Sequence, residues 1–267
     1  MELIRNIFRA EKIEYFAPLS YGDVKTVNNR LLSRVGFEPK SVIIFLVPYY
    51  SGETVNISRY AASLDYHLVI KSITERVIGE LLKLYPENSF CGFGDHSPIA
   101  EGHAALLGGL GALGDNGLLI NEKYGSYVFI GDILTDIEPE ILGCVEPKPI
   151  SECLHCGACK AACPTGVLLG KSSDCLSAIT QRRGELTEGE ISLMRSVGTV
   201  WGCDVCQSAC PYNRSVEKTP LSIFFEDRIE KLSVRLLDEM TDDEFSKRAF
   251  AWRGKAVLYR NLEKAKI

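Results

Sequence analysis

The sequence lacks the features that would carry a protein into or through a membrane. The longest apolar run in its 267 residues lies around Val42–Tyr50, which is too short to span a bilayer. The first six residues have neither the apolar core nor the small-residue cleavage site of a signal peptide. We therefore expect a cytoplasmic protein with no membrane partner.

An excess of positive charge is also lacking. The chain has 30 Lys and Arg against 35 Asp and Glu, a net charge of -5. Because polyanion binding needs concentrated positive charge, this balance does not favour a whole-chain nucleic-acid binder. Residues 245–267 run against the trend, with Glu263 as the one acid among Lys247, Arg248, Arg253, Lys255, Arg260, Lys264 and Lys266. We interpret this segment as a solvated helix face, with a phosphate-binding patch as the alternative.

The rest of the composition is that of a folded globular protein. Hydrophobic residues make up 46% of the chain and charged residues 24%, which is enough to bury a core in one large domain or two small ones. Apolar, β-branched runs at 41–47 and 127–134 predict strands, and apolar residues at helical spacing over 59–85 predict a helix. Strands mixed with helices predict an α/β or α+β domain over residues 1–146.

A proline-rich stretch, Val145–Ser151, predicts a linker after this domain. Residues 151–215 hold the clustered cysteines, and residues 216–267 are expected to form a helical extension. Thr187 and Glu190 have capping-box spacing, which predicts a helix between the two cysteine groups. Gly109–Gly114 matches G-x-G-x-x-G, but the residues before it predict a helix and not the strand that a dinucleotide site requires.

The ten cysteines are the strongest chemical signal in the sequence. In a reducing compartment they indicate metal ligands and not disulfides. The first group follows C-x2-C-x2-C-x3-C-P, the bacterial ferredoxin run, whose fourth cysteine ligates the other cluster in two-cluster ferredoxins. The second group follows C-x2-C-x3-C-P and has one cysteine fewer, so Cys175, between the groups, can complete the set.

These spacings predict two [4Fe-4S] clusters with crossed ligation. We assign one cluster to Cys153, Cys156, Cys159 and Cys210, and the other to Cys163, Cys175, Cys203 and Cys206. Structural zinc is the alternative, because paired C-x-x-C motifs also bind zinc, although zinc sites usually lack the third cysteine and the Cys-Pro ends. Cys91 and Cys144 lie outside the pattern and are expected to be small buried residues.

Further motifs, together with the cysteine block, resemble those of epoxyqueuosine reductases over most of the chain. They are Arg59-Tyr60-Ala61, Asp65-Tyr66-His67, the residues 95–101 (Asp-His-Ser-Pro-Ile-Ala-Glu), 109–116, 125–129, 134–136, and Arg260-Asn261. Position 115 is Asp where the family usually has Lys. Many members continue into a helical-repeat domain that helps to hold tRNA, so we expect a short form that lacks it.

The resemblance implies a cobalamin-dependent enzyme, related to reductive dehalogenases, that converts epoxyqueuosine in tRNA to queuosine. It implies a nitroreductase-like α/β domain that binds the corrinoid, followed by a ferredoxin-like module with two [4Fe-4S] clusters. The proton donor of the family corresponds to Asp95. Asp95 and four further residues are expected to contact the cofactor: Arg59, Tyr66, His67 and Ser177. Besides tRNA, the expected partner is a low-potential electron donor.

Two other functions stay open at this point. One is a cobalamin-dependent reductase of the same build that acts on another small molecule. The other is an electron-transfer protein with two clusters and no corrinoid. For Asp95 itself, the structural alternative is a helix cap or turn residue before Pro98. As a general acid it would have to keep its proton near neutral pH, which burial beside an apolar cofactor would favour.

Overall fold

The computed structural model describes residues 1–267, and these form two compact units. Unit 1 comprises residues 1–48 and 67–154, and unit 2 comprises residues 49–66 and 155–267. The chain therefore leaves unit 1 after residue 48 and returns to it at residue 67, before it reaches the cysteine-rich part. The predicted division into three domains, residues 1–146, 151–215 and 216–267, stays a prediction.

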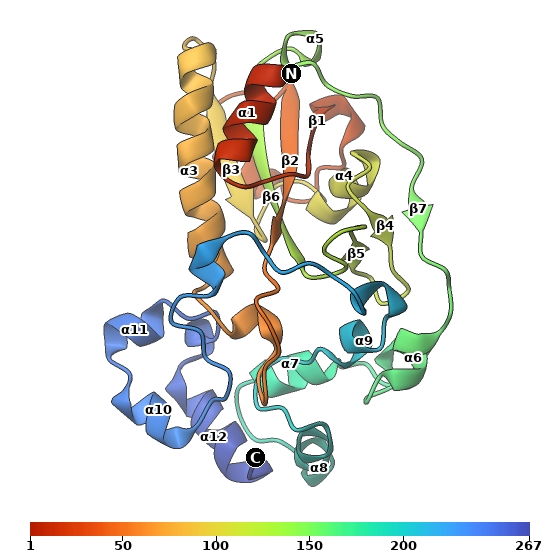
Figure 1. The fold of residues 1–267 in the computed structure, drawn as a ribbon, viewed down its shortest axis with the longest axis vertical. Coiled ribbons are helices and arrows are strands. Elements are labelled where there is room, and N and C mark those ends of the chain that lie inside the picture. Colours follow the sequence, from red (N-terminus) through yellow and green to blue (C-terminus); the bar gives the residue numbers. More distant parts are fainter. The chain divides into compact units, whose positions relative to one another are not determined.

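The centre of unit 1 is a four-stranded sheet in the order β1-β2-β6-β3 (Figure 1). Its strands are β1 (Phe16–Ser20), β2 (Ser41–Pro48), β6 (Val128–Thr135) and β3 (Phe90–Gly94), and every neighbouring pair is antiparallel. All residues of β2 are buried, as its continuous apolar, β-branched sequence predicts. The strands predicted at 41–47 and 127–134 are thus confirmed, in a mixed α and β fold.

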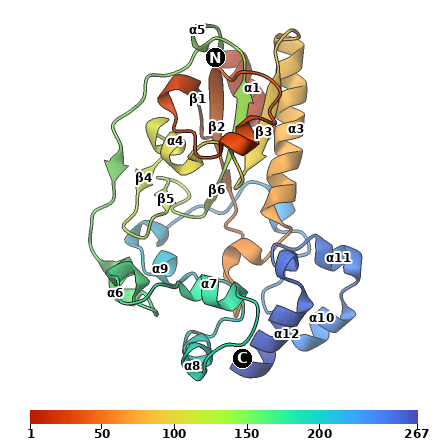
Figure 2. The ribbon, with the colours of Figure 1, turned by 180° about the vertical axis from the view of Figure 1, so that it is seen from behind.

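Helices cover both faces of this sheet. On one face lie α1 (Glu2–Ala10) and α3 (Tyr66–Leu84). The Phe8 ring of α1 is 5.5 Å from the Phe45 ring of β2. Helix α3 packs so closely on β3 that a Cβ on Gly94 would lie 2.7 Å from the Ile70 side chain. Figures 1 and 2 both show α3 beside β3. On the other face, α4 (Glu101–Leu107) shares one hydrophobic core with Ile44 and Leu134. The helix predicted over 101–107 is therefore confirmed.

The shorter elements of unit 1 include a second sheet in the order β5-β4-β7. Its strands are β4 (Ala112–Leu113), β5 (Leu119–Ile120) and β7 (Ser151–Glu152), and the remaining elements are η1 (Tyr21–Asp23), α2 (Asn29–Leu32) and α5 (Pro139–Leu142). Gly109 follows α4 and not a strand, and a Cβ on Gly111 would lie 2.6 Å from the Ile120 carbonyl oxygen. These glycines allow close backbone approach and do not form a dinucleotide site.

The proline-rich stretch 145–151 is tied to unit 1 along its length. The Val145 amide donates to the Pro18 carbonyl, the Lys148 amide donates to the Leu107 carbonyl, and Ser151 begins β7. Cys91 and Cys144 are partly exposed, so the expectation that both are buried is wrong in degree.

The helix predicted over 59–85 begins later than expected. Residues 59–61 form a separate 3-10 turn, η2 (Arg59–Ala61), and α3 starts at Tyr66. Between them Leu64 makes a β-bridge with Arg248, and the Asp65 amide donates to the Lys247 carbonyl. These tertiary bonds occupy the backbone groups that a longer helix would need.

Unit 2 is built from short helices around two small hydrophobic cores. They are α6 (Ala158–Ala162), η3 (Val167–Leu169), α7 (Leu176–Gln181), α8 (Glu188–Val197), α9 (Val205–Ser208), η4 (Pro211–Asn213), η5 (Ser222–Phe224), α10 (Val234–Glu239), α11 (Asp242–Ser246), η6 (Ala251–Arg253) and α12 (Lys255–Ala265). One core surrounds Trp201 and Phe250, and the other surrounds Leu176 and Met194. The capping box of Thr187 and Glu190 is formed at the start of α8, as predicted.

The basic segment 245–267 is not simply a solvated face. Arg248 is buried and donates to the Asp227 carbonyl, Lys255 donates to the Met240 carbonyl, and Arg260 donates to the Arg182 carbonyl. Three of its cations are thus used inside unit 2, which leaves fewer for a phosphate-binding patch. No helix in the structure is both long and apolar enough to cross a bilayer.

Candidate functional site

Asp95 lies in unit 1, directly after β3, in a loop whose far end is fixed by backbone bonds. The Pro98 carbonyl accepts from the amides of Val27 and Asn28, and the Ala100 amide donates to the Lys25 carbonyl. Asp95 itself has a φ of 62°, in the left-handed region that few residues other than glycine adopt. Such strained residues are often found at functional sites.

His67, in the first turn of α3, meets Asp95. The His67 Nε2 atom lies 3.3 Å from Oδ2 of Asp95, and the two side chains are 48% and 58% exposed. Two of the residues singled out by sequence therefore come together at one end of the sheet. Their exposure leaves them accessible to a ligand.

Two further acids in unit 1 belong to the same neighbourhood. Burial, followed by the charges of Asp132 and Asp95, raises the pKa of Glu101 to about 8. The backbone N–H of Asp95 donates to the Glu101 carboxyl and opposes this shift. Asp132, in the centre of β6, has no exposed surface, and its burial raises its pKa to about 7. Both carboxyls can therefore hold protons near neutral pH.

The predicted cluster ligands are spread over both units. Seven of them lie in unit 2, while Cys153 ends unit 1, where its amide donates to the Leu113 carbonyl. None of the ten cysteines is in a disulfide. Burial, together with the charges of Cys175 and Cys206, raises the pKa of the Cys203 thiol to about 12. A bound metal would oppose this shift, because it favours the deprotonated thiolate.

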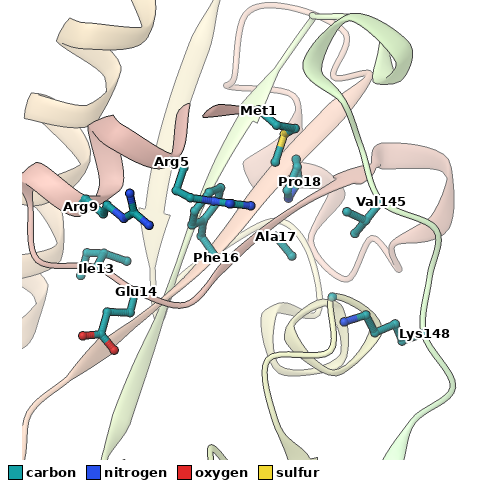
Figure 3. Close-up of a pocket in the computed structure, with 11 residues that line it drawn as sticks. Met1, Arg5, Arg9, Ile13, Glu14, Phe16, Ala17, Pro18, Val145 and Lys148 are labelled. Carbon is teal, nitrogen blue, oxygen red and sulfur yellow. The ribbon is translucent and has the colours of Figure 1, made fainter. Parts of the chain in front are cut away.

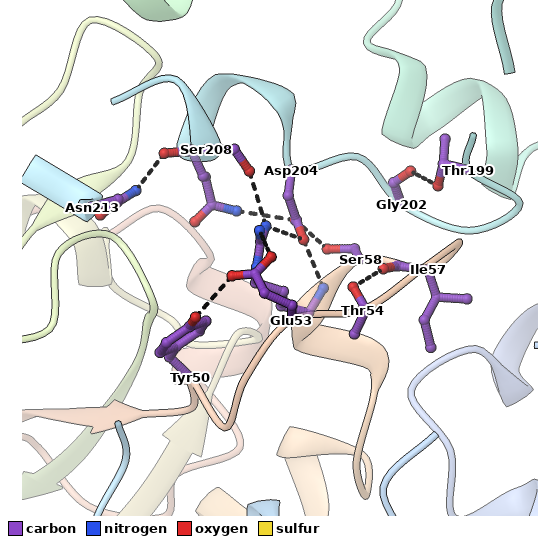
Figure 4. Close-up of polar contacts among 12 residues, drawn as sticks. Tyr50, Glu53, Thr54, Ile57, Ser58, Thr199, Gly202, Asp204, Ser208 and Asn213 are labelled. Carbon is purple, nitrogen blue, oxygen red and sulfur yellow. Dashed lines mark hydrogen bonds and ion pairs between the residues drawn. The ribbon is translucent and has the colours of Figure 1, made fainter. Parts of the chain in front are cut away.

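Arg59 sits at the centre of a polar network in unit 2, with partners Glu53, Asp204 and Ser208, which are labelled in Figure 4. Its guanidinium pairs with Asp204 at 3.1 Å and also pairs with Glu53, and its backbone amide donates to Asp204. The Arg59 and Asp204 side chains are only 12% and 8% exposed, and Asp204 also accepts from the Ser58 hydroxyl. Because Asp204 follows Cys203 directly, this network fixes the backbone beside a predicted cluster ligand.

Tyr60 links the two other predicted residues of unit 2. Gln181 donates to the Ser177 hydroxyl at 3.0 Å and to the Tyr60 hydroxyl at 3.3 Å. The Trp201 indole also donates to the Tyr60 hydroxyl, and the Tyr60 ring packs edge-on against Tyr66. Ser177 and Tyr66 are therefore joined through a residue that the sequence analysis quoted only as part of a motif.

Each unit contains a cavity of substantial volume. A cavity of about 430 Å³ in unit 2 is lined by Arg59, Cys203 and Asp204, among others. A cavity of about 590 Å³ in unit 1 is lined by Arg5, Arg9, Lys148 and Glu14 (Figure 3). Since Glu14 is paired with Lys123, the net charge around this second cavity is positive. It contains none of the predicted site residues.

Sequence reasoning missed Glu101, Asp132, Asp204 and Tyr60 as site residues. A signal existed for Asp132, which is the one charged residue in an apolar strand. Glu101 stands in the quoted 95–101 motif. Tyr60 stands in the quoted Arg59-Tyr60-Ala61 motif. Asp204 carried no local signal, because its role depends on partners far away in the chain.

Comparisons with known proteins place this chain among related enzymes. Residues 152–213 match the 4Fe-4S double cluster binding domain family. The epoxyqueuosine reductase of Leadbetterella byssophila is 32% identical over 216 residues, which cover 78% of this chain and 69% of that protein. The epoxyqueuosine reductase of Lactococcus garvieae is 28% identical over 260 residues, which cover 89% of this chain and 72% of that protein.

A solved structure agrees with the sequence relatives. The epoxyqueuosine reductase from Streptococcus thermophilus is 25% identical and matches with a TM-score of 0.79, over 98% of this chain and 79% of that one. The mixed α and β fold and the double [4Fe-4S] cluster domain are thus both found in this protein. The chain belongs to the epoxyqueuosine reductase family.

Proposed function

We propose that this protein reduces epoxyqueuosine in tRNA to queuosine, with Asp95 as the proton donor and two [4Fe-4S] clusters as the electron path. Membership of the epoxyqueuosine reductase family is the observation that carries the proposal. Removing the epoxide oxygen as water takes two electrons and two protons. The clusters supply only the electrons. Residues of the protein must therefore hold the substrate and supply the protons.

The eight cysteines outside Cys91 and Cys144 are the proposed cluster ligands. The first cluster takes Cys153, Cys156, Cys159 and Cys210, and the second takes Cys163, Cys175, Cys203 and Cys206. The charges of Cys175 and Cys206 both act on the Cys203 thiol, which supports the assignment of these three to one cluster. Seven of the ligands belong to unit 2, which contains most of the proposed ferredoxin-like module, residues 151–215.

Unit 1 is the proposed nitroreductase-like domain that binds cobalamin. Phe93, Val128 and Ile130 are only partly buried at the end of the sheet where Asp95 lies, so they offer an apolar surface to a large flat cofactor. When bound, cobalamin supplies a strongly reducing cobalt centre. Five residues are proposed to contact it: Asp95, His67, Arg59, Tyr66 and Ser177.

Asp95 is proposed to give its proton to the epoxide oxygen as the carbon–oxygen bond breaks. Its loop is fixed at Pro98 and Ala100, while its carboxyl is accessible and held by His67. A positioned acid of this kind typically accelerates proton transfer by roughly 10²–10⁴-fold.

Anaerobic reconstitution with iron, sulfide and cobalamin tests the proposal. After gel filtration we expect about eight irons per chain, as two [4Fe-4S] clusters require, together with one cobalt. With a chemical low-potential donor, the loaded protein should convert epoxyqueuosine in tRNA to queuosine, measured by mass spectrometry of the nucleosides. Loss of the corrinoid with the irons retained would instead indicate a two-cluster electron carrier. Full loading without conversion of the tRNA would indicate another substrate.

A further inference from the structure

Unit 1 buries two carboxyl groups that hydrogen bonds do not satisfy. Both carboxyl oxygens of Asp132 and the Oε2 atom of Glu101 are buried without a hydrogen-bond partner. Burial without a hydrogen-bond partner disfavours the ionised carboxylate, so the pKa of each group is raised toward the neutral range. A natural protein rarely keeps such groups without a use for them.

Asp132 lies in the middle of the sheet and faces α4. In register it stands between Ile44 of β2 and Phe93 of β3, and the core around it is apolar. Glu101 is in the first turn of α4, which packs on the same face of β6. Asp132 is therefore closed off from solvent, and Glu101 interacts both with it and with Asp95.

The contacts of Glu101 connect it to both neighbours. Its carboxyl accepts from the backbone N–H of Asp95, and it feels the negative charges of Asp132 and Asp95. The His67 charge has the opposite effect on Glu101. The three acids thus form an ordered series from the core to the accessible end of the sheet: Asp132, Glu101 and Asp95.

Few other titratable groups face this series. Strand β2 has none, β3 offers only Cys91, whose pKa is raised by burial and by Asp132, and His103 of α4 is exposed. The Ser97 hydroxyl lies near Asp132 and lowers the pKa of its carboxyl. It does not complete a hydrogen bond to either carboxyl oxygen of Asp132. No cation is among the groups that shift the pKa of Asp132, so protonation is the way in which it becomes neutral.

We infer that Glu101 and Asp132 are a buried proton store behind Asp95, which supplies the second proton that each reduction consumes. The inference rests on the proposed function. Asp95 gives one proton to the epoxide oxygen as the first carbon–oxygen bond breaks, and the two electrons of the reduction would come through the clusters. The second carbon–oxygen bond breaks as the oxygen leaves as water, which takes another proton, and a double bond forms between the two carbons. Glu101 returns a proton to Asp95, Asp132 replaces the proton of Glu101, and solvent reloads the series afterwards.

Infrared difference spectroscopy over a pH series tests whether the two groups hold protons. In the cluster-loaded wild-type protein, carbonyl bands of protonated carboxyls should disappear as the pH rises through about 7 and about 8. In Asp132→Asn one band should be absent, and the Glu101 band should disappear at a lower pH because the neighbouring negative charge is gone. The matched control is Glu140→Gln on α5, an exposed acid, and it should change neither band. Ionised carboxyls at pH 6 would overturn the inference.

Turnover against pH tests whether the stored protons are used. The variant Glu101→Gln/Asp132→Asn should convert tRNA about 100-fold more slowly than the wild type at neutral pH, as loss of proton delivery predicts. The wild-type rate should also fall as the store ionises, and this fall should be absent in the double variant. Equal pH–rate profiles would overturn the inference. If the wild type converts no epoxyqueuosine, the proposed function fails, while the infrared result still decides whether the carboxyls hold protons.

Discussion

The Nε2 atom of His67 lies 3.3 Å from Oδ2 of Asp95, and this pair joins the first turn of α3 to the loop after β3. The loop is fixed at Pro98 and Ala100, but the Asp95 side chain is 58% exposed. His67 therefore restrains the exposed carboxyl of Asp95. We regard His67 as a residue that positions the proposed proton donor.

Removing the imidazole should slow the reaction without unfolding the protein. In His67→Ala we expect kcat to fall about tenfold, because a misplaced acid transfers its proton less efficiently. His67→Gln keeps a hydrogen-bond donor and should lose less. The control is His103→Ala, which removes an exposed histidine from α4. Equal rates in His67→Ala and His103→Ala, measured with saturating tRNA, would show that the contact has no positioning role.

The buried acid Asp132 should make the protein less stable as the pH rises. Its pKa is raised from an ordinary value of 3.8 to about 7, so between these values the folded state binds more protons than the unfolded state. The free energy of unfolding should then fall with rising pH, by about 2–3 kcal/mol from pH 5 to pH 8 for this group. Asp132→Asn should remove that part of the pH dependence in anaerobic denaturant titrations. An unchanged dependence would mean that Asp132 is ionised throughout.

Asn261 should contribute strongly to the stability of unit 2. It is fully buried, and its side-chain amide donates to the carbonyls of Thr180 and Val200 at 2.7 and 2.8 Å. Asn261→Ala would leave both carbonyls buried without this partner, at a cost of about 2–4 kcal/mol. Asn6→Ala, on the exposed face of α1, is the matched control and should change stability little. A similar unfolding midpoint for both variants would contradict the structure here.

The pair of Arg59 and Asp204 should be coupled energetically. Both side chains are nearly buried, so Arg59→Ala leaves the Asp204 charge poorly compensated, at a cost of about 2–4 kcal/mol. Asp204→Asn removes the negative charge, and the double variant should be more stable than the sum of the single changes predicts. The midpoint of denaturation of the cluster-loaded protein measures this. Additive effects would show that the two residues act independently.

The sequence was sufficient for the features that depend on neighbours along the chain. Cysteine spacing identified the double cluster domain, apolar runs located β2 and β6, and the pair Thr187 and Glu190 located the start of α8. Each of these patterns is local. The sequence therefore contained the signal in full.

Features that depend on distant partners could not be predicted in this way. The start of α3 is moved to Tyr66 because backbone groups near Leu64 pair with residues 247 and 248. Arg248 and Arg260 looked like surface charges, but carbonyl groups elsewhere in unit 2 accept their hydrogen bonds. Asp132 looked like an irregularity in a strand, and only the packing of α4 on the sheet shows that it is buried beside Glu101.

The most direct test of the account compares the wild type with Asp95→Asn, each loaded with clusters and cobalamin, in the conversion of epoxyqueuosine to queuosine in tRNA. We expect the wild type to convert it and Asp95→Asn to be at least about 100-fold slower, with the same iron and cobalt content and the same optical spectrum. Asp243→Asn, an exposed aspartate in α11, should match the wild type. Undiminished conversion by Asp95→Asn would contradict the assignment of the proton donor, and no conversion by the fully loaded wild type would contradict the proposed function.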